Sequence, residues 1–139
     1  MNVENILTDY KLSVRKILLL KNKLEHLEKI SILKTTHYSD DVLSGKRQTM
    51  YDKYEKMMSE KEELKLVIAS EELSVAAVEK TLELLADTHL TEVNALKLRY
   101  LKNKTIPYIA QELGYSERGI VNKIKLAKEE FKGLYQFIA

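Results

Sequence analysis

A chain of 139 residues with 45% hydrophobic and 32% charged residues has the composition of a folding protein and not of a disordered one. It contains no cysteine, which excludes disulfides, thiolate zinc sites and thiol nucleophiles. Four glycines and one proline allow few tight turns, so we expect an all-α fold. No apolar run approaches the roughly 20 residues of a membrane span, and we expect a cytoplasmic protein without a membrane partner.

The first predicted element is a long helix over residues 2–33. Its apolar residues alternate steps of three and four, the seven-residue period of helices that pair along their length. The stripe is made of Val3, Ile6, Tyr10, Ile17, Leu20, Leu24 and Leu27, with Ser13 in its one vacant place. Leu7, Val14 and Leu18 widen the stripe on one side, and we expect a hairpin alone to leave this flank exposed.

Residues 34–48, KTTHYSDDVLSGKRQ, lose the period and concentrate Thr, Ser, Asp and Gly, which predicts a loop and a candidate contact site. A second helix with the same spacing is predicted from Met50 to Leu85. Lys61 and Glu71 interrupt its stripe, and Ser70 can begin a new helix if the stripe is broken there. The two stripes predict an antiparallel hairpin within one chain, or helices that pair between chains.

Residues 87–139 are predicted to form a helix-turn-helix domain, with Asp87 or Thr88 as the cap of its first helix. Farther on, two short helical patterns are separated by a three-residue turn that contains glycine, which is the form of a helix-turn-helix. The expected boundaries are Thr105 as a cap, Pro107 in the first turn, Gly114 as a left-handed stop, Ser116 as the next cap and Gly133 as the end.

The second helix of this motif has an apolar face and a polar face. The apolar face is expected to pack on the preceding helix, through Ile120, Ile124, Ala127 and Phe131 against Ile106, Ile109, Ala110 and Leu113. The polar face collects Arg118, Asn122 and Lys125. Arginine can bind guanine and asparagine can bind adenine through paired hydrogen bonds, and Val121 between the faces can touch a thymine methyl group.

The charge of the chain is distributed unevenly. Residues 89–139 hold 9 Lys/Arg against 5 Asp/Glu, whereas residues 1–88 hold 14 against 16. A basic helix-turn-helix favours nucleic acid over the alternative of a helical bundle with an ordinary polar surface. The helix N-terminus at Ser116 can receive a phosphate. The predicted DNA-binding set is Thr105, Ser116, Arg118, Val121, Asn122, Lys123, Lys125, Lys102 and Lys104, with Lys102 and Lys123 assigned to phosphates.

No group of residues suggests catalysis. His26, His37 and His89 are far apart, and none has metal-ligand spacing to another histidine or to a pair of carboxylates. The sequence contains no glycine-rich phosphate loop and no nucleophile motif. We therefore expect neither an enzyme, nor a metal site, nor a cofactor.

The stretch LKLRYLKNKTIPYIAQELGYSERGIVNKIKLAKEEF resembles region 4 of sigma-70 family factors, and more closely phage regulators of the ArpU and RinA type. The likeness covers about residues 90–132. Leu98-Arg99-Tyr100, Ile109-Ala110, the run from Glu112 to Ser116 and the spacing to Phe131 carry it. The sequence departs from the family at Pro107-Tyr108, where acidic residues are usual, and at Gly119, which replaces Thr, Ser or Arg.

The resemblance implies a transcription regulator of phage or prophage late genes that binds double-stranded DNA, with host RNA polymerase as a candidate partner. It assigns Ser116, Arg118, Asn122 and Lys125 to DNA. The alternative is a DNA-packaging protein similar to a terminase small subunit, or a structural coiled-coil adaptor. We expect residues 1–86 to form a helical hairpin or coiled coil that makes a homodimer or higher oligomer, and residues 87–139 to form the DNA-binding domain.

Overall fold

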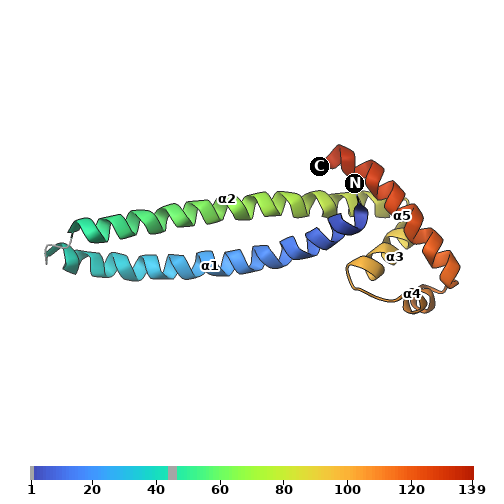
Figure 1. Cartoon of the computed structure of the whole chain (residues 1–139), viewed down its shortest axis with the longest axis horizontal. Coiled ribbons are helices and arrows are strands. Elements are labelled where there is room, and N and C mark those ends of the chain that lie inside the picture. Colours follow the sequence, from blue (N-terminus) through green and yellow to red (C-terminus); the bar gives the residue numbers. More distant parts are fainter. Residues whose placement is uncertain (1, 44–46) are drawn as a thin grey trace. The chain divides into compact units, whose positions relative to one another are not determined.

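The computed structural model describes the backbone of residues 2–43 and 47–139 and the side chains of residues 2–30 and 51–139. In this part of the chain there are five α-helices and no strand, so the prediction of an all-α fold is confirmed. The helices are α1 (Val3–Leu43), α2 (Arg47–Ala86), α3 (Leu90–Tyr100), α4 (Ile106–Leu113) and α5 (Glu117–Ile138) (Figure 1). None of these described helices combines the length and apolarity needed to cross a lipid bilayer.

The chain divides into two compact units. Met1–Val14 and Leu73–Ala139 form one, which we call the helix-turn-helix unit, and Arg15–Glu72 forms the other, which we call the two-helix unit. The predicted boundary at residue 86 differs from this division, because the ends of α1 and α2 belong with α3, α4 and α5.

The long helices extend farther than the sequence predicts. α1 continues to Leu43 and α2 begins at Arg47, so most of the predicted loop is helical, and residues 44–46 lie outside the described part. The helix can continue through residues 34–43 because they contain neither glycine nor proline. Thr, Ser and Asp have a low helix propensity, but this only weakly disfavours a helix. The possible break near Ser70 is also absent, since α2 is continuous to Ala86.

In the two-helix unit, α1 and α2 lie side by side and antiparallel (Figure 1). The predicted stripes form the seam between them, where Ile17, Met57 and Ile68 are buried. Half-buried positions accompany them along the seam: Leu20, Leu24, Leu27, Tyr54, Lys61, Leu64 and Glu71. The charged interruption at Glu71 is accommodated by an ion pair of 2.9 Å with Lys16 Nζ on α1.

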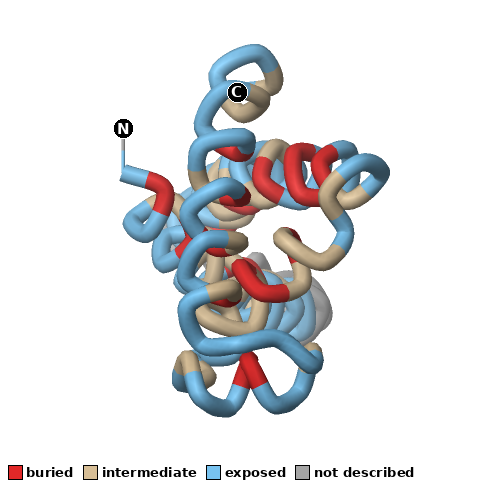
Figure 2. Tube along the Cα trace, turned by 90° about the vertical axis from the view of Figure 1, so that its right-hand side faces the viewer, coloured by how far each residue is buried: buried red, intermediate tan, exposed pale blue. Residues whose placement is uncertain are grey.

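The helix-turn-helix unit has one core built from all five helices. α1 and α2 contribute Val3, Leu7, Val78, Leu82 and Leu85, α3 contributes Val93, Ala95 and Leu96, α4 contributes Ile109 and Ala110, and α5 contributes Ile120, Ile124, Ala127 and Phe131. Buried segments alternate with exposed ones along the trace, as expected when one face of a helix is covered (Figure 2). The predicted apolar face of the second motif helix is therefore confirmed.

The flank predicted to be exposed is only partly so. Leu7 is completely buried in the core of the helix-turn-helix unit, Val14 is half-buried, and Leu18 is 62% exposed. The expectation was wrong for Leu7 because α3, α4 and α5 present an apolar surface that the first turns of α1 cover.

Two helix ends also differ from the prediction. His89, and neither Asp87 nor Thr88, is the N-cap of α3, and it makes no side-chain capping hydrogen bond. α5 continues through Gly133 to Ile138. A glycine inside a helix costs roughly 1 kcal/mol relative to alanine, but Leu134 and Tyr135 beyond it pack against the core and favour continuation.

We expect Leu7→Ala to destabilise the protein by about 2–5 kcal/mol, because it leaves a cavity in a closed core. Leu12→Ala is the matched control on the same helix, since Leu12 is 57% exposed, and should change stability by less than about 0.5 kcal/mol. Urea unfolding followed by far-UV circular dichroism measures both. Equal effects would show that α1 does not complete this core.

Candidate nucleic-acid interface

Capping interactions fix the start of α4, its end and the start of α5. Thr105 Oγ1 accepts a hydrogen bond of 3.3 Å from Tyr108 N at the start of α4. Gly114 closes α4 with a left-handed φ of 76°, which glycine adopts without steric cost. Ser116 Oγ accepts a bond of 3.0 Å from Gly119 N at the start of α5. The predicted caps and stop are confirmed, and they fix where the exposed face of α5 begins.

Gly119, a departure from the family pattern, has a local structural explanation. A Cβ atom there would lie 3.1 Å from Ser116 Oγ, which is closer than most such contacts. Glycine therefore leaves space for the capping oxygen that bonds its own amide. The capped turn compensates for part of the lower helix propensity of this residue.

Four predicted residues come together on the exposed side of α5. Arg118, Val121, Asn122 and Lys125 follow the i, i+3, i+4, i+7 spacing that places them on one helical face. Each is exposed, and Val121 is exposed by 50% although it is apolar. The face presents a guanidinium, an amide, an ammonium and an aliphatic group, which is the side-chain chemistry that reads base edges.

Lys123 is placed differently. Its Nζ lies 3.5 Å from Glu92 Oε1 on α3, and only 24% and 19% of these two side chains are exposed. The same nitrogen lies 4.4 Å from the centroid of the Tyr115 ring, a cation–π contact with the turn. The structure therefore does not group Lys123 with the exposed face, and its contacts connect α5 to α3 and to the turn.

The remaining predicted cations lie in the segment between α3 and α4. Lys102 is exposed, and Lys104 Nζ lies 4.9 Å from the centroid of the Tyr108 ring. Asn103 has a left-handed φ of 54°, and the carbonyl oxygen of Lys104 accepts a bond of 3.0 Å from Arg99 Nη1. These contacts order the segment that leads to Thr105 and place the Lys104 side chain over the Tyr108 ring.

A hollow of about 240 Å³ adjoins the exposed face of α5. It is lined by Arg99, Tyr100, Ile106, Val121, Ile124, Lys125 and Lys128. Of these, the predicted set includes only Val121 and Lys125. Arg99 and Lys128 were missed because their meeting depends on how α3 packs against α5. The only signal in the sequence was that Lys125 and Lys128 are three residues apart, which places them on the same side of a helix.

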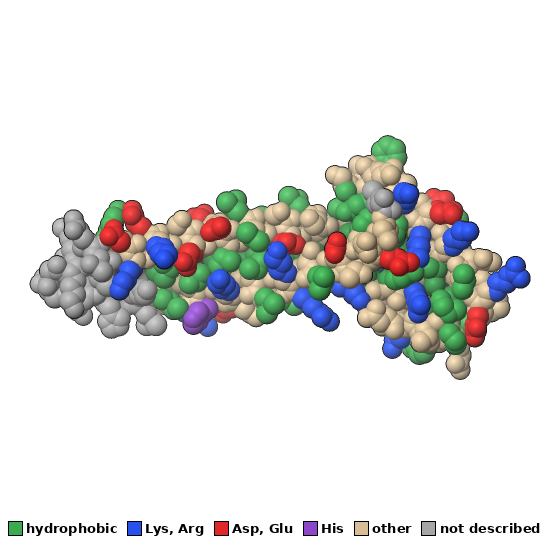
Figure 3. Space-filling model, in the orientation of Figure 1, with side chains coloured by type: hydrophobic (Ala, Val, Ile, Leu, Met, Phe, Trp, Pro, Cys, Tyr) green, Lys and Arg blue, Asp and Glu red, His purple; other side chains and the backbone are tan. Residues whose placement is uncertain are grey.

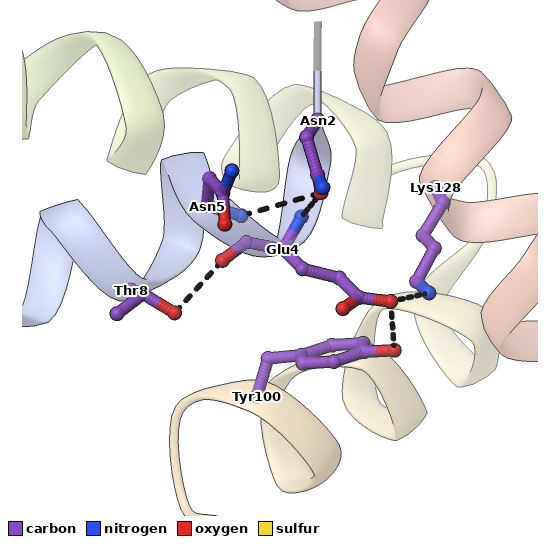
Figure 4. Close-up of polar contacts among 6 residues, drawn as sticks. All are labelled: Asn2, Glu4, Asn5, Thr8, Tyr100 and Lys128. Atoms are coloured by element: carbon purple, nitrogen blue, oxygen red, sulfur yellow. Dashed lines mark hydrogen bonds and ion pairs between the residues drawn. The ribbon is translucent and has the colours of Figure 1, made fainter.

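The first turn of α1 reaches the same place within the helix-turn-helix unit. Asn2 Oδ1 caps α1 by accepting a bond of 2.9 Å from Glu4 N. Glu4 Oε1 accepts bonds from Lys128 Nζ at 2.6 Å and from Tyr100 Oη at 3.0 Å (Figure 4). Lys128 Nζ also lies 4.7 Å from the centroid of the Tyr100 ring. No feature of the sequence paired Glu4 with residues about a hundred positions away.

Ionisation follows these contacts. The hydrogen bond from Lys128, followed by the bond from Tyr100, lowers the pKa of Glu4 below its ordinary value of 4.5. Burial lowers the pKa of Lys128, but its bonds with Glu4 and Tyr100 outweigh this and raise the pKa overall. On the neighbouring turn of α1, burial and the bond to Glu79 raise the pKa of Tyr10 to about 12. Glu4 and Lys128 therefore form an ion pair at neutral pH.

The described helices form an all-α protein in which a capped turn joins α4 to α5, and α5 has an exposed face that carries Arg118 and Lys125. The chain matches none of the protein-family models, curated proteins or solved structures with which it was compared. In the described part of the chain, no group of three or more His, Cys, Asp or Glu residues is arranged to hold a metal ion. The geometry and the sequence resemblance are the basis for a functional proposal.

We expect Lys123→Ala to destabilise the protein by about 1–2 kcal/mol, because Glu92 would keep a largely buried carboxylate without its cation. Lys125→Ala, two residues along α5 and exposed, is the control and should change stability by less than about 0.5 kcal/mol. Thermal unfolding measures the difference. If both variants unfold like the parent protein, the ion pair with Glu92 contributes nothing to the fold.

Proposed function

We propose that this protein is a sequence-specific DNA-binding transcription regulator that inserts α5 into the major groove. The observation that carries the proposal is the division of α5 into two faces after a capped three-residue turn. Ile120, Ile124 and Ala127 are buried against the rest of the unit, while Arg118 and Asn122 stand exposed on the other side. A recognition helix needs this arrangement, because one face must be anchored and the other must reach base edges.

The charge of the unit supports the same proposal. Lys and Arg side chains outnumber acidic ones over residues 97–128 by 8 to 2. In the view of Figure 3, several of them lie over the region of α3, α4 and α5. Cations of this kind bind the phosphate backbone regardless of sequence, while the residues on the helix face supply specificity. The free amides at the start of α5, next to Ser116, can receive one phosphate.

The biological setting follows from the resemblance to sigma region 4 and to regulators of the ArpU and RinA type. We propose control of phage or prophage late genes in the cytoplasm of the host, with RNA polymerase as a candidate partner. A packaging protein would use the same helix face on DNA. An adaptor would use the long helices alone, so DNA binding separates it from the other two.

We expect Asn122→Ala to weaken binding to a selected DNA site while leaving binding to random duplex nearly unchanged. Base contacts set specificity, and a good pair of hydrogen bonds is worth about 1–3 kcal/mol. The site is first obtained by selection from a random duplex library. Fluorescence anisotropy then measures affinity for the selected and random duplexes over a range of salt concentrations.

Lys102→Ala is the matched comparison, because Lys102 is an exposed cation outside the helix face. It should weaken binding to both duplexes alike and lower the salt slope by about one charge. Equal loss on both duplexes with Asn122→Ala would remove asparagine from base recognition. Failure of the parent protein to bind any duplex at low salt would refute the proposed function.

We further propose that the protein is a homodimer or higher oligomer. One helix-turn-helix offers few base contacts, and paired half-sites are the usual solution. In the two-helix unit, Leu18 and Leu19 of α1 and Leu66 of α2 are between 62% and 73% exposed. Apolar side chains emerge along these helices in Figure 3. Burying them between chains would supply an apolar interface.

Sedimentation equilibrium of the full chain is expected to show association at roughly tens of micromolar or below. Leu18→Glu combined with Leu66→Glu should produce a monomer, because charges would enter the interface. Phe137→Ala is the control, since Phe137 is 90% exposed at the other end of the chain. A monomeric parent protein would refute association, and loss of association with Phe137→Ala would assign the interface to α5. A fragment starting at Asp87 is unsuitable, because it lacks Leu7 and Leu82 of the core.

A further inference from the structure

The hollow between the end of α3 and the exposed face of α5 has the composition of an anion site. Three cationic side chains line it: Arg99 from α3, and Lys125 and Lys128 from α5. Tyr100, Ile106, Val121 and Ile124 provide the rest of the wall. Apolar side chains beside a cation lower the local dielectric constant and strengthen its attraction for an anion.

Two of the three cations, Arg99 and Lys128, are held in place before any ligand arrives. Arg99 Nη1 donates to the carbonyl oxygen of Lys104, which fixes the guanidinium at the end of α3. Lys128 is held by Glu4 and lies over the ring of Tyr100. Such preorganisation favours a compact anion with several oxygens, because little side-chain freedom remains to be lost on binding.

Glu4 contacts two of the residues that line this pocket, Tyr100 and Lys128. One carboxylate oxygen contacts both Lys128 Nζ and Tyr100 Oη, as a phosphate oxygen would (Figure 4). The carboxylate is not sealed in, since 50% of the Glu4 side chain is exposed. One cation of the pocket, Lys128, is therefore already paired with a carboxylate that solvent still reaches.

We propose that this basic pocket binds a phosphate group of DNA, and that the Glu4 carboxylate competes with the phosphate for Lys128. The source of the phosphate rests on the DNA binding proposed above. The pocket is continuous with that interface, because Val121 and Lys125 belong to both. The negative charge of Glu4 repels the phosphates and so weakens binding to any DNA sequence. Because Glu4 occupies Lys128, this lysine does not bind a phosphate and release its counterion.

Replacing Glu4 should not release α1 from the unit. Val3 and Leu7 on the same turns are buried in the core, and Lys11 Nζ makes a second polar contact of 3.2 Å with Asn103 Oδ1. Glu4→Gln keeps the size of the side chain and removes its charge. The variant therefore tests the charge of Glu4 with the helix in place, and thermal unfolding verifies that the fold is retained.

The experiment compares Glu4→Gln with Glu83→Gln in the full chain on a random DNA duplex. Glu83 is exposed on α2 and is 3.9 Å from Lys80 within that helix, whereas Glu4 is paired with Lys128 of the pocket. We expect Glu4→Gln to bind about three- to tenfold more tightly, with a salt slope steeper by about one charge. Glu83→Gln makes the same change in net charge and should alter affinity by less than about twofold. Equal affinities for the two variants would overturn the proposal.

A second arm uses inorganic phosphate and needs no DNA. Phosphate titrations followed by amide NMR should move the signals of residues 99–100 and 125–128, more strongly in Glu4→Gln than in the parent protein. Lys125→Gln should reduce this response, and it serves in place of Glu4→Gln if that variant does not fold. A phosphate response without DNA binding would support the pocket and refute the proposed function. No response in any variant would overturn the pocket.

Discussion

The burial of the first turns of α1 is the constraint on which the helix-turn-helix unit depends. Leu7 and Val3 come from one end of the chain and fill a core whose other walls are α3, α4 and α5. A domain of about fifty residues buries too small a fraction of its surface to be stable with ease. The added turns of α1 and α2 enlarge that core, so α5 is anchored partly by residues from the other end of the sequence.

The same packing determines the electrostatics of the proposed interface. Because α1 is anchored at Leu7, Glu4 one turn earlier is carried to the end of α3 and to the middle of α5. Its carboxylate then meets Lys128 and Tyr100, next to Arg99 and Lys125. Glu4, near the N-terminal end of the sequence, thus adds a negative charge beside the basic side chains of α3 and α5.

Lys123 and Lys125 of α5 differ in whether their charge is paired within the protein. Lys123 is held by Glu92 and by the Tyr115 ring, so its charge stabilises the packing of α5 on α3 and the turn. Lys125 is exposed on the face that carries Arg118 and Asn122. The spacing along the helix decides this, because Lys123 lies about 160° around the helix axis from Lys125. Lysines two residues apart in a basic helix therefore need not share a partner.

The sequence by itself determined the all-α class, the two faces of α5, both caps of the turn and the seam of the long helices. Each of these depends on residues within a few turns of one another, such as Ser116 with Gly119, so periodicity and capping chemistry are sufficient. The tertiary structure decided where the core closes, that Leu7 is buried, that Lys123 pairs with Glu92, and that Glu4 meets Lys128. These contacts join residues that are far apart in the sequence. Which residues meet depends on how the helices pack, and local sequence patterns do not contain that information.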